Sequence, residues 1–307
     1  MEEILFRGIN MKVGFVGLGI MGNPMAKNLL KGQIELYVND INKDAENELV
    51  SAGAVKVDDL KQLGSLCDVI ILMLPNAAIV KTVLFGVNGI ASTLKKNSIV
   101  VDMSSLSPID TKEINEKLAL LEVEYLDAPV SGGQPKAIDG TLSVMIGGSE
   151  EAIEKVKPIL NHLAADIVPI GGSGSGSTVK LANQILVNVT IAALSEAAVL
   201  AAKAGVDLNK MHAAIRNGLA GSTVLDAKLP LMIDRNFVAG GRIDINTKDL
   251  LNIEQTGRTL EVPLPLTTTV LGMFHCLKAD GKAGDDHGGL VQYYEKLANF
   301  EIPKGGK

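Results

Sequence analysis

Three glycines directly after an apolar run restrict the fold of this chain more than any other feature. The run KVGFVG spans residues 12–17 and ends in Gly17, which with Gly19 and Gly22 forms the pattern G-x-G-x-x-G. In this pattern the first glycine permits a tight turn, the second leaves the backbone uncovered, and the third lets a helix pack closely on the strand. The pattern therefore predicts a strand, a turn and a helix in succession.

An acidic residue closes the next apolar run, ELYVND. Asp40 stands 21 residues after Gly19, where a carboxylate can accept hydrogen bonds from both ribose hydroxyls of a dinucleotide. The same carboxylate would repel a 2′-phosphate, and Ile41 and Asn42 follow it in place of an arginine. The sequence therefore favours NAD(H) over NADP(H). The expected cofactor contacts are Gly17, Leu18, Gly19, Ile20, Met21, Gly22, Asn39 and Asp40.

Apolar runs alternate with helical patterns through the first half of the chain. The remaining runs lie at 68–74, 98–103, 123–128, 141–147 and 166–171, and the helical patterns include 21–32, 43–52, 108–121 and 149–162. Near-continuous apolar runs are typical of strands covered on both faces, and their alternation with helices is typical of a parallel sheet. Residues 11–173 are therefore predicted to form an α/β domain with a doubly wound, Rossmann-type sheet.

The pattern changes after Gly171. A glycine- and serine-rich loop at 171–177 gives way to a stretch from Ser177 to Ala204 that contains no glycine or proline and little charge. A helix that is apolar nearly all round is buried on most sides. Because no convincing strand follows, residues 174–307 are predicted to form an all-helical domain that begins with a long interdomain helix.

Composition argues against several classes of function. The chain has 29 lysines and arginines against 35 acidic residues, so it lacks the basic surface that nucleic acids require. Its most apolar segment, Leu181–Ser195, has 15 residues, which is shorter than the ~20 that cross a bilayer. The two cysteines lie 209 residues apart, and residues 1–10 do not form a signal peptide. A cytoplasmic protein without a membrane span is expected.

The four histidines do not predict a metal site. None has metal-ligand spacing with another histidine or a cysteine. The tripeptide at 285–287, Asp-Asp-His, could hold a metal but is more typical of the cap of a helix.

Lys180 is a lone cation near the start of the predicted long helix. Asn183 and Gln184 follow it at i+3 and i+4, so the ammonium and two amides share one helix face. One interpretation is a lysine whose stem packs while its head reaches solvent. The other is a general acid, because reduction of a carbonyl by hydride leaves an alkoxide that needs a proton and a nearby positive charge. The adjoining amides favour the second interpretation.

Three loops follow predicted strands in the first half. Ser131-Gly132-Gly133 can form a small nest for a carboxylate, although this tripeptide is more often an ordinary turn. Leu74-Pro75-Asn76 and the segment 102–105, Asp-Met-Ser-Ser, end two other strands, where cofactor contacts are expected in a doubly wound sheet.

Five sequence blocks occur in order at consistent spacing: the glycine pattern at 17–22, DAPVSGG at 127–133, GTLSVMIGG at 140–148, VKLANQ at 179–184 and TKDL at 247–250. Together they resemble the β-hydroxyacid dehydrogenase family from Met11 to about Ala298. The resemblance implies that Lys180 is the catalytic lysine and that Ser105 and Lys248 contact the cofactor. It also implies the substrate-binding residues Ser131, Gly132, Gly133, Asn183 and Gln184.

Within the family, the likeness is greatest to the branch that reduces tartronate semialdehyde to glycerate, through the stretches at 131–148, 218–228, 232–237 and 293–298. The resemblance implies a small carboxylate-bearing aldehyde or hydroxyacid as substrate, glyoxylate metabolism as the setting, and a tetramer or dimer built through the helical domain. Departures at 240–241, 246 and 288–289 bear on the choice of substrate. Two alternatives stay open: a dehydrogenase of 3-hydroxyisobutyrate or another small 3-hydroxyacid, and a dinucleotide-binding module without catalysis.

Overall fold

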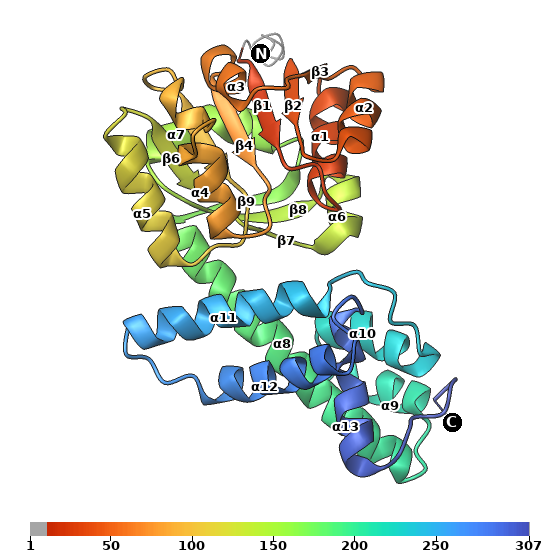
Figure 1. Cartoon of the computed structure of the whole chain (residues 1–307). Helices are drawn as coiled ribbons and strands as arrows, with labels where there is room; N and C mark the ends of the chain where they lie inside the picture. The colour runs from red at the N-terminus through yellow and green to blue at the C-terminus, as the bar shows by residue number, and fades with distance from the viewer. Residues whose placement is uncertain (1–10, 307) are drawn as a thin grey trace, which may run out of the picture. The chain divides into compact units, whose positions relative to one another are not determined.

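The computed structural model describes residues 11–306, which separate into two compact units (Figure 1). The first unit extends to Lys180 and the second begins at Leu181. The expectation for residues 1–10 lies outside the described residues. The predicted domain boundary at 173/174 stays a prediction, because compactness does not show which part of the chain folds independently.

A mostly parallel sheet forms the centre of the first unit. Its strands are β1 (Val13–Val16), β2 (Leu36–Asn39), β3 (Val55–Lys56), β4 (Val69–Leu72), β5 (Ile99–Asp102), β6 (Glu124–Asp127), β7 (Val130–Ser131), β8 (Leu142–Gly147) and β9 (Ala164–Gly171). They lie in the order β3-β2-β1-β4-β5-β6-β8-β7, with β9 paired to β8. Strands β1 to β6 are parallel, and β8 runs antiparallel to β6 and β7. The predicted α/β class is confirmed.

Helices cover both faces of this sheet (Figure 1). They are α1 (Gly22–Lys31), α2 (Lys43–Ser51), α3 (Leu60–Leu66), α4 (Ala77–Phe85), the 3-10 helix η1 (Ile90–Ser92), α5 (Pro108–Ala119), α6 (Gly133–Asp139) and α7 (Glu150–Leu160). Successive residues of a strand face opposite sides, so Phe15 packs in the core beneath α1 while Val16 packs in the core beneath α3 to α5. This double burial explains the near-continuous apolar runs.

One strand departs from the expectation of burial on both faces. Strand β9 pairs only with β8, and most of its residues are exposed or half-buried. The apolar run at 166–171 therefore predicts the strand correctly but not its surroundings, because an edge position leaves one side of the strand without a neighbour.

The second unit is helical throughout its described residues. Its elements are α8 (Ser175–Lys203), which begins in the first unit, α9 (Leu208–Ile215), α10 (Thr223–Asp234), α11 (Ile243–Thr259), α12 (Pro265–Ala279), the 3-10 helix η2 (His287–Leu290) and α13 (Val291–Ala298). Fully buried side chains from several of these helices, including Ile191, Leu229, Leu250 and Phe274, share one core. The predicted all-helical second half is confirmed.

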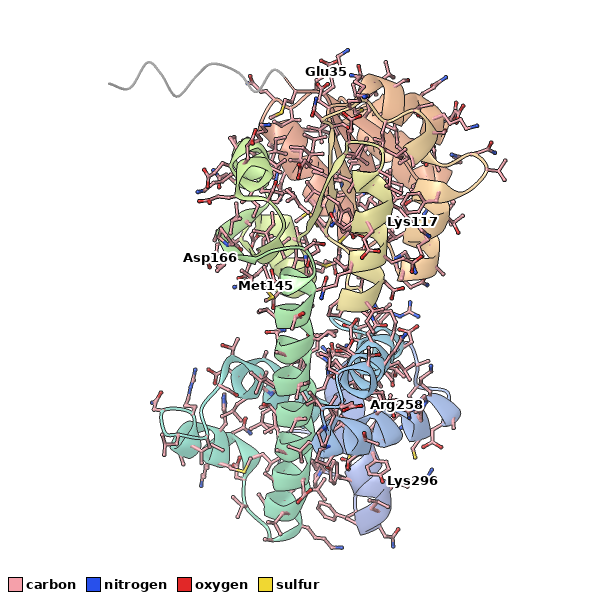
Figure 2. All side chains as sticks on the ribbon, turned by 90° about the vertical axis from the view of Figure 1, so that its left-hand side faces the viewer. Glu35, Lys117, Met145, Asp166, Arg258 and Lys296 are labelled. Atoms are coloured by element: carbon pink, nitrogen blue, oxygen red, sulfur yellow. The ribbon has the colours of Figure 1, made fainter. Side chains whose placement is uncertain are left out.

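Helix α8 is one continuous helix of 29 residues (Figure 2). By length and composition it is long and apolar enough to cross a membrane, a test that the core helix of a soluble protein also passes. The length argument drawn from Leu181–Ser195 alone is therefore wrong. Burial is the better guide, because Ile191, Leu194 and Ala198 pack in the core of the helical unit.

Candidate active site

The glycine turn joins β1 to α1, and its three glycines meet different demands. A Cβ atom at Gly22 would lie 1.8 Å from the carbonyl oxygen of Gly17, so the helix start has no room for a side chain. Gly17 has a φ of +99°, and a Cβ there would lie 2.3 Å from the carbonyl oxygen of Met73. A Cβ at Gly19 would meet nothing within 4 Å. The turn is thus closed toward the protein and open in front of Gly19.

Asp40 lies directly beside this turn. One carboxylate oxygen accepts a hydrogen bond from the backbone N–H of Leu18, and the other accepts from the N–H of Asn42 at 2.7 Å. Asn39 is fixed by a 2.7 Å hydrogen bond from its Nδ2 to the carbonyl oxygen of Val57. Open space at Gly19 beside a carboxylate at the end of β2 fits a dinucleotide, with phosphates over the turn and ribose hydroxyls at Asp40.

The loops after β4 and β5 are tied to each other. The N–H of Leu74 donates to Oγ of Ser104 at 2.9 Å, and the N–H of Ser104 donates to Oδ1 of Asp102 at 2.9 Å. Asn76 caps α4 by accepting from the N–H of Ile79 at 3.0 Å. The hydroxyl of Ser105 is buried in the second loop. Both loops leave the carboxyl edge of the sheet, as the glycine turn does.

Lys180 and the loop at 131–133 lie next to each other. The ammonium of Lys180 donates to the carbonyl oxygen of Val130 at 2.8 Å, and the residue is only 9% exposed. Its head therefore does not extend into solvent. Gly132 and Gly133 have φ values of +135° and +68°, a region that favours glycine, so this loop needs its two glycines for its backbone shape.

A second group of predicted residues lies in the helical unit. Nε2 of Gln184 donates to Oδ2 of Asp249 at 2.7 Å, and Nδ2 of Asn183 donates to Oε1 of Gln184 at 3.2 Å. The ammonium of Lys248 lies 3.1 Å from Oδ1 of Asp249, at ion-pair distance but without hydrogen-bond alignment. Because a carboxylate only accepts, Asp249 fixes which end of the Gln184 amide faces it.

Three buried carboxylates organise these groups; sequence reasoning placed one of them in the segment 102–105, where cofactor contacts are expected, and assigned no role to the other two. They are Asp102, Asp127 and Asp249, each at most 3% exposed. Ionisable residues of this kind are almost never fully buried unless they are partnered. The available signal was an acid at the end of a strand: Asp102 and Asp127 are the last residues of β5 and β6, and Asp40 directly follows β2.

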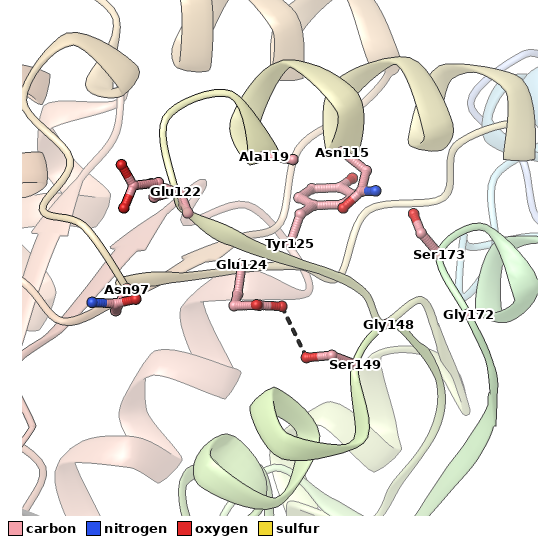
Figure 3. A pocket seen from close by; sticks show the side chains of 11 residues that line it. Asn97, Asn115, Ala119, Glu122, Glu124, Tyr125, Gly148, Ser149, Gly172 and Ser173 are labelled. Atoms are coloured by element: carbon pink, nitrogen blue, oxygen red, sulfur yellow. Dashed lines mark hydrogen bonds between the residues drawn. The ribbon is translucent and has the colours of Figure 1, made fainter.

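Two further observations concern metal binding and cavities in the described residues. Residues 11–306 contain no cluster of three or more histidine, cysteine or acidic side chains that could hold a metal ion. A cavity of about 630 Å³ opens in the first unit and is lined in part by Asn115, Tyr125, Ser149 and Ser173 (Figure 3). None of the predicted site residues lines it.

Two family profiles match most of the chain. The profile of the NAD binding domain of 6-phosphogluconate dehydrogenase matches residues 12–172. The profile described as NAD-binding of NADP-dependent 3-hydroxyisobutyrate dehydrogenase matches residues 174–294. Both halves of the chain thus match domains of NAD(P)-dependent dehydrogenases.

Full-length relatives agree with these profiles. The chain is 43% identical to 2-hydroxy-3-oxopropionate reductase of Escherichia coli, over 95% of this chain and 100% of that protein. It is 36% identical to L-threonate dehydrogenase of Escherichia coli, over 94% and 97% of the two chains. A solved 3-hydroxyisobutyrate dehydrogenase from Salmonella typhimurium superimposes with a TM-score of 0.83 at 34% identity, over 92% of this chain and 99% of that chain. The chain therefore belongs to the β-hydroxyacid dehydrogenase family and is a 3-hydroxyacid dehydrogenase of the tartronate semialdehyde reductase type.

Proposed function

We propose that this protein reduces tartronate semialdehyde (2-hydroxy-3-oxopropanoate) to glycerate with NADH, as a cytoplasmic enzyme of glyoxylate metabolism. The observation that carries the proposal is the position of Lys180. Its buried ammonium contacts the carbonyl oxygen of Val130, the residue directly before Ser131. A proton donor and a loop suited to a carboxylate are thus neighbours, as reduction of a short oxoacid requires.

The residues around Gly19 and Asp40 would hold the cofactor, with Leu74, Pro75, Asn76, Ser105 and Lys248 as further contacts. When bound, NADH supplies the hydride for the carbonyl carbon. Asp40 supports NADH over NADPH, because its carboxylate would repel a 2′-phosphate and Ile41, 99% exposed, stands where an arginine could compensate.

The chain's own residues then bind the substrate and supply the proton. The N–H groups of Gly132 and Gly133 and the hydroxyl of Ser131 hold the substrate carboxylate. Asn183 and Gln184 contact its hydroxyl group. Lys180 stabilises the negative charge that develops on the carbonyl oxygen and gives that oxygen a proton, which completes the new hydroxyl group. The resulting neutral amine takes its proton back from solvent.

The test is NADH oxidation with tartronate semialdehyde by wild type, Lys180→Ala and Lys203→Ala. Loss of a general acid should lower kcat by about 10²- to 10⁴-fold in Lys180→Ala. Lys203 lies on the same helix, is exposed and donates to the carbonyl oxygen of Ala298, so Lys203→Ala should keep full activity. Near-normal activity of Lys180→Ala would remove the lysine from the mechanism, and a rate with NADPH equal to that with NADH would contradict the cofactor preference.

A second candidate substrate is L-threonate. An L-threonate dehydrogenase is 36% identical to this chain, and the match covers nearly the whole length of both proteins. A panel that contains tartronate semialdehyde, L-threonate and 3-hydroxyisobutyrate, ranked by kcat/KM, separates the candidates. NADH binding without turnover on any of them would support the alternative of a non-catalytic module.

Helix α8 also supports assembly into a homo-oligomer. Its exposed residues include apolar side chains spaced by four, seven, four and three residues: Ala182, Leu186, Ala193, Ala197 and Leu200. Residues at this spacing form one helix face, and contiguous exposed apolar surface marks association sites. We propose a tetramer or dimer, for which light scattering would give a multiple of the 32.3 kDa chain mass.

A further inference from the structure

We propose that Asp127 is a positioning residue that sets the distance between Lys180 and the loop at 131–133. Its buried carboxylate fixes the first turn of α8, which carries Lys180. Asp127 is also the last residue of β6, the strand that leads into the loop. The inference rests on the proposed role of Lys180 as general acid.

The carboxylate of Asp127 binds the start of α8 with both oxygens. Oδ1 accepts from the N–H of Gly174 at 2.8 Å, and Oδ2 accepts from the N–H of Ser177 at 2.7 Å. The first N–H groups of a helix have no partner within the helix and carry its positive dipole end, so an anion stabilises them. Asp127 is 2% exposed, which removes water as an alternative partner.

Both parts of the proposed proton-transfer site are linked to this carboxylate. Lys180 follows Ser177 by three residues, slightly less than one turn of α8, so fixing Ser177 fixes the base of the lysine side chain. Ser131 follows Asp127 by four residues, across the bend between β6 and β7. The hydrogen bond from Lys180 to the carbonyl oxygen of Val130 joins the helix directly to the residue before the loop. A shift of the helix start would therefore change the separation of ammonium and loop.

The helix start is pressed against the sheet so tightly that no side chain fits between them. A Cβ at Gly176 would lie 2.3 Å from the carbonyl oxygen of Met145 and 2.6 Å from that of Asp127. A Cβ at Gly147 would lie 2.6 Å from Oδ1 of Asp127. This close approach lets a short carboxylate reach two N–H groups of the helix, and it leaves α8 little freedom to move.

A second contact holds the same turn from another element. The hydroxyls of Thr111, on α5, and Ser177 lie 3.0 Å apart, and both residues are fully buried. Thr111 therefore offers a milder way to loosen the turn without removing Asp127.

The test compares Asp127→Asn, Asp127→Ala and Thr111→Val with wild type, with rates normalised to the NADH-binding sites found by titration. The amide of Asn keeps one acceptor oxygen but turns a donor toward the other N–H group, so we expect kcat to fall about 10-fold. In Asp127→Ala both contacts are lost, and a displacement near 1 Å lowers the rate by about 10²-fold. Thr111→Val should lower kcat about 3-fold. The NADH dissociation constant should change less than 2-fold throughout.

A further readout separates positioning from simple destabilisation. If the chemical step is slowed, the isotope effect on kcat with deuterated NADH should rise in the Asp127 variants, whereas loss of folded enzyme leaves it unchanged. Asp59 gives a matched control, because it also caps a helix, α3, by accepting from the N–H of Lys61 at 2.9 Å, but it is exposed. Asp59→Asn should keep the wild-type kcat and isotope effect.

Each outcome has one meaning. Normalised kcat and isotope effect at the wild-type level in both Asp127→Asn and Thr111→Val would overturn the positioning role while Lys180→Ala remains inactive. If Asp127→Ala does not fold, Thr111→Val and Asp127→Asn still decide the matter. Full activity of Lys180→Ala would instead overturn the proposed function on which this role rests.

Discussion

Two buried aspartates of the first unit and two of the helical unit are held in different ways. In the first unit, Asp102 and Asp127 occupy paired positions on adjacent strands and accept from backbone N–H groups and a tyrosine hydroxyl. In the helical unit, Asp286 is 2.8 Å from the ammonium of Lys228, and Asp249 is 3.1 Å from that of Lys248. Asp102 and Asp127 thus have neutral donors, whereas Asp286 and Asp249 also face a lysine ammonium.

The pKa values follow this difference. Burial raises the pKa of Asp102 to about 6 and also raises that of Asp127, because neutral donors only partly replace water. For Asp286, burial acts in the same direction, but the Lys228 ammonium and backbone N–H groups outweigh it and the pKa is lowered. Asp102 and Asp127 therefore depend on neutral donors, whereas Asp286 has an ion pair with Lys228 in addition to its backbone donors.

The largest expected effect comes from adding a methyl group to a glycine of the first unit, where backbone packs closely, and to a glycine of the helical unit, where space is open. In Gly22→Ala the new Cβ would lie 1.8 Å from the carbonyl oxygen of Gly17, so backbone must move, and we expect a loss of about 5 kcal/mol in the free energy of unfolding. Gly272 lies inside α12 with nothing within 4 Å of its Cβ position, so Gly272→Ala should add about 0.5–1 kcal/mol. Urea unfolding measures both.

Gly19→Ala is the matched control within the glycine turn. Its Cβ would meet nothing within 4 Å, so stability should change little, while NADH affinity should fall because the methyl group occupies the space proposed for the phosphates. If Gly19→Ala left NADH affinity intact, the cofactor would not lie over this turn. Equal stability of Gly22→Ala and wild type would show that the turn is not closely packed.

The second test breaks the buried charge pair of the helical unit. Lys228→Met leaves Asp286, fully buried, with only its backbone donors, and we expect a loss of about 4 kcal/mol in the free energy of unfolding. Lys155→Met removes an exposed pair with Glu151 and should cost less than about 0.5 kcal/mol. Adding Asp286→Asn to Lys228→Met should recover part of the loss. A cost as small as that of Lys155→Met would mean that backbone donors alone support Asp286, as they support Asp127.

What the sequence could predict depends on whether a feature is set by neighbouring residues or by distant ones. The glycine turn, Asp40 and the long helix were predictable because their physical demands act on neighbouring residues: a tight turn, a strand end, a stretch without breakers. Asp249 was not, because its role depends on Gln184, which lies 65 residues away on another helix. Strands β3 and β7 have only two residues each, too few for any apolar pattern. Local constraints leave a signal in sequence, whereas pairings between distant helices do not.

The smallest effect is a pH dependence that has opposite signs for Asp102 and Asp286. The folded protein binds a proton at Asp102 more tightly than the unfolded chain does, with a pKa of about 6 against an ordinary value of 3.8. This carboxyl group therefore lowers stability progressively as pH rises from about 4 to about 7, by about 3 kcal/mol in total at 1.4 kcal/mol per pKa unit. Asp102→Asn lacks the titration, so its stability relative to wild type should improve by that amount over the range.

Asp286→Asn should show the reverse slope. A lowered pKa in the folded state means that the charged carboxylate stabilises the protein above its ordinary pKa of 3.8, and that this contribution is lost as pH falls through the folded value. The free energy of unfolding of Asp286→Asn should therefore rise relative to that of wild type only as the pH falls below about 4. Urea unfolding at half-unit pH steps from 3 to 8 gives both difference curves. Parallel slopes would contradict the comparison, since neutral donors leave the pKa of buried Asp102 raised, whereas the Lys228 ammonium helps to lower that of Asp286.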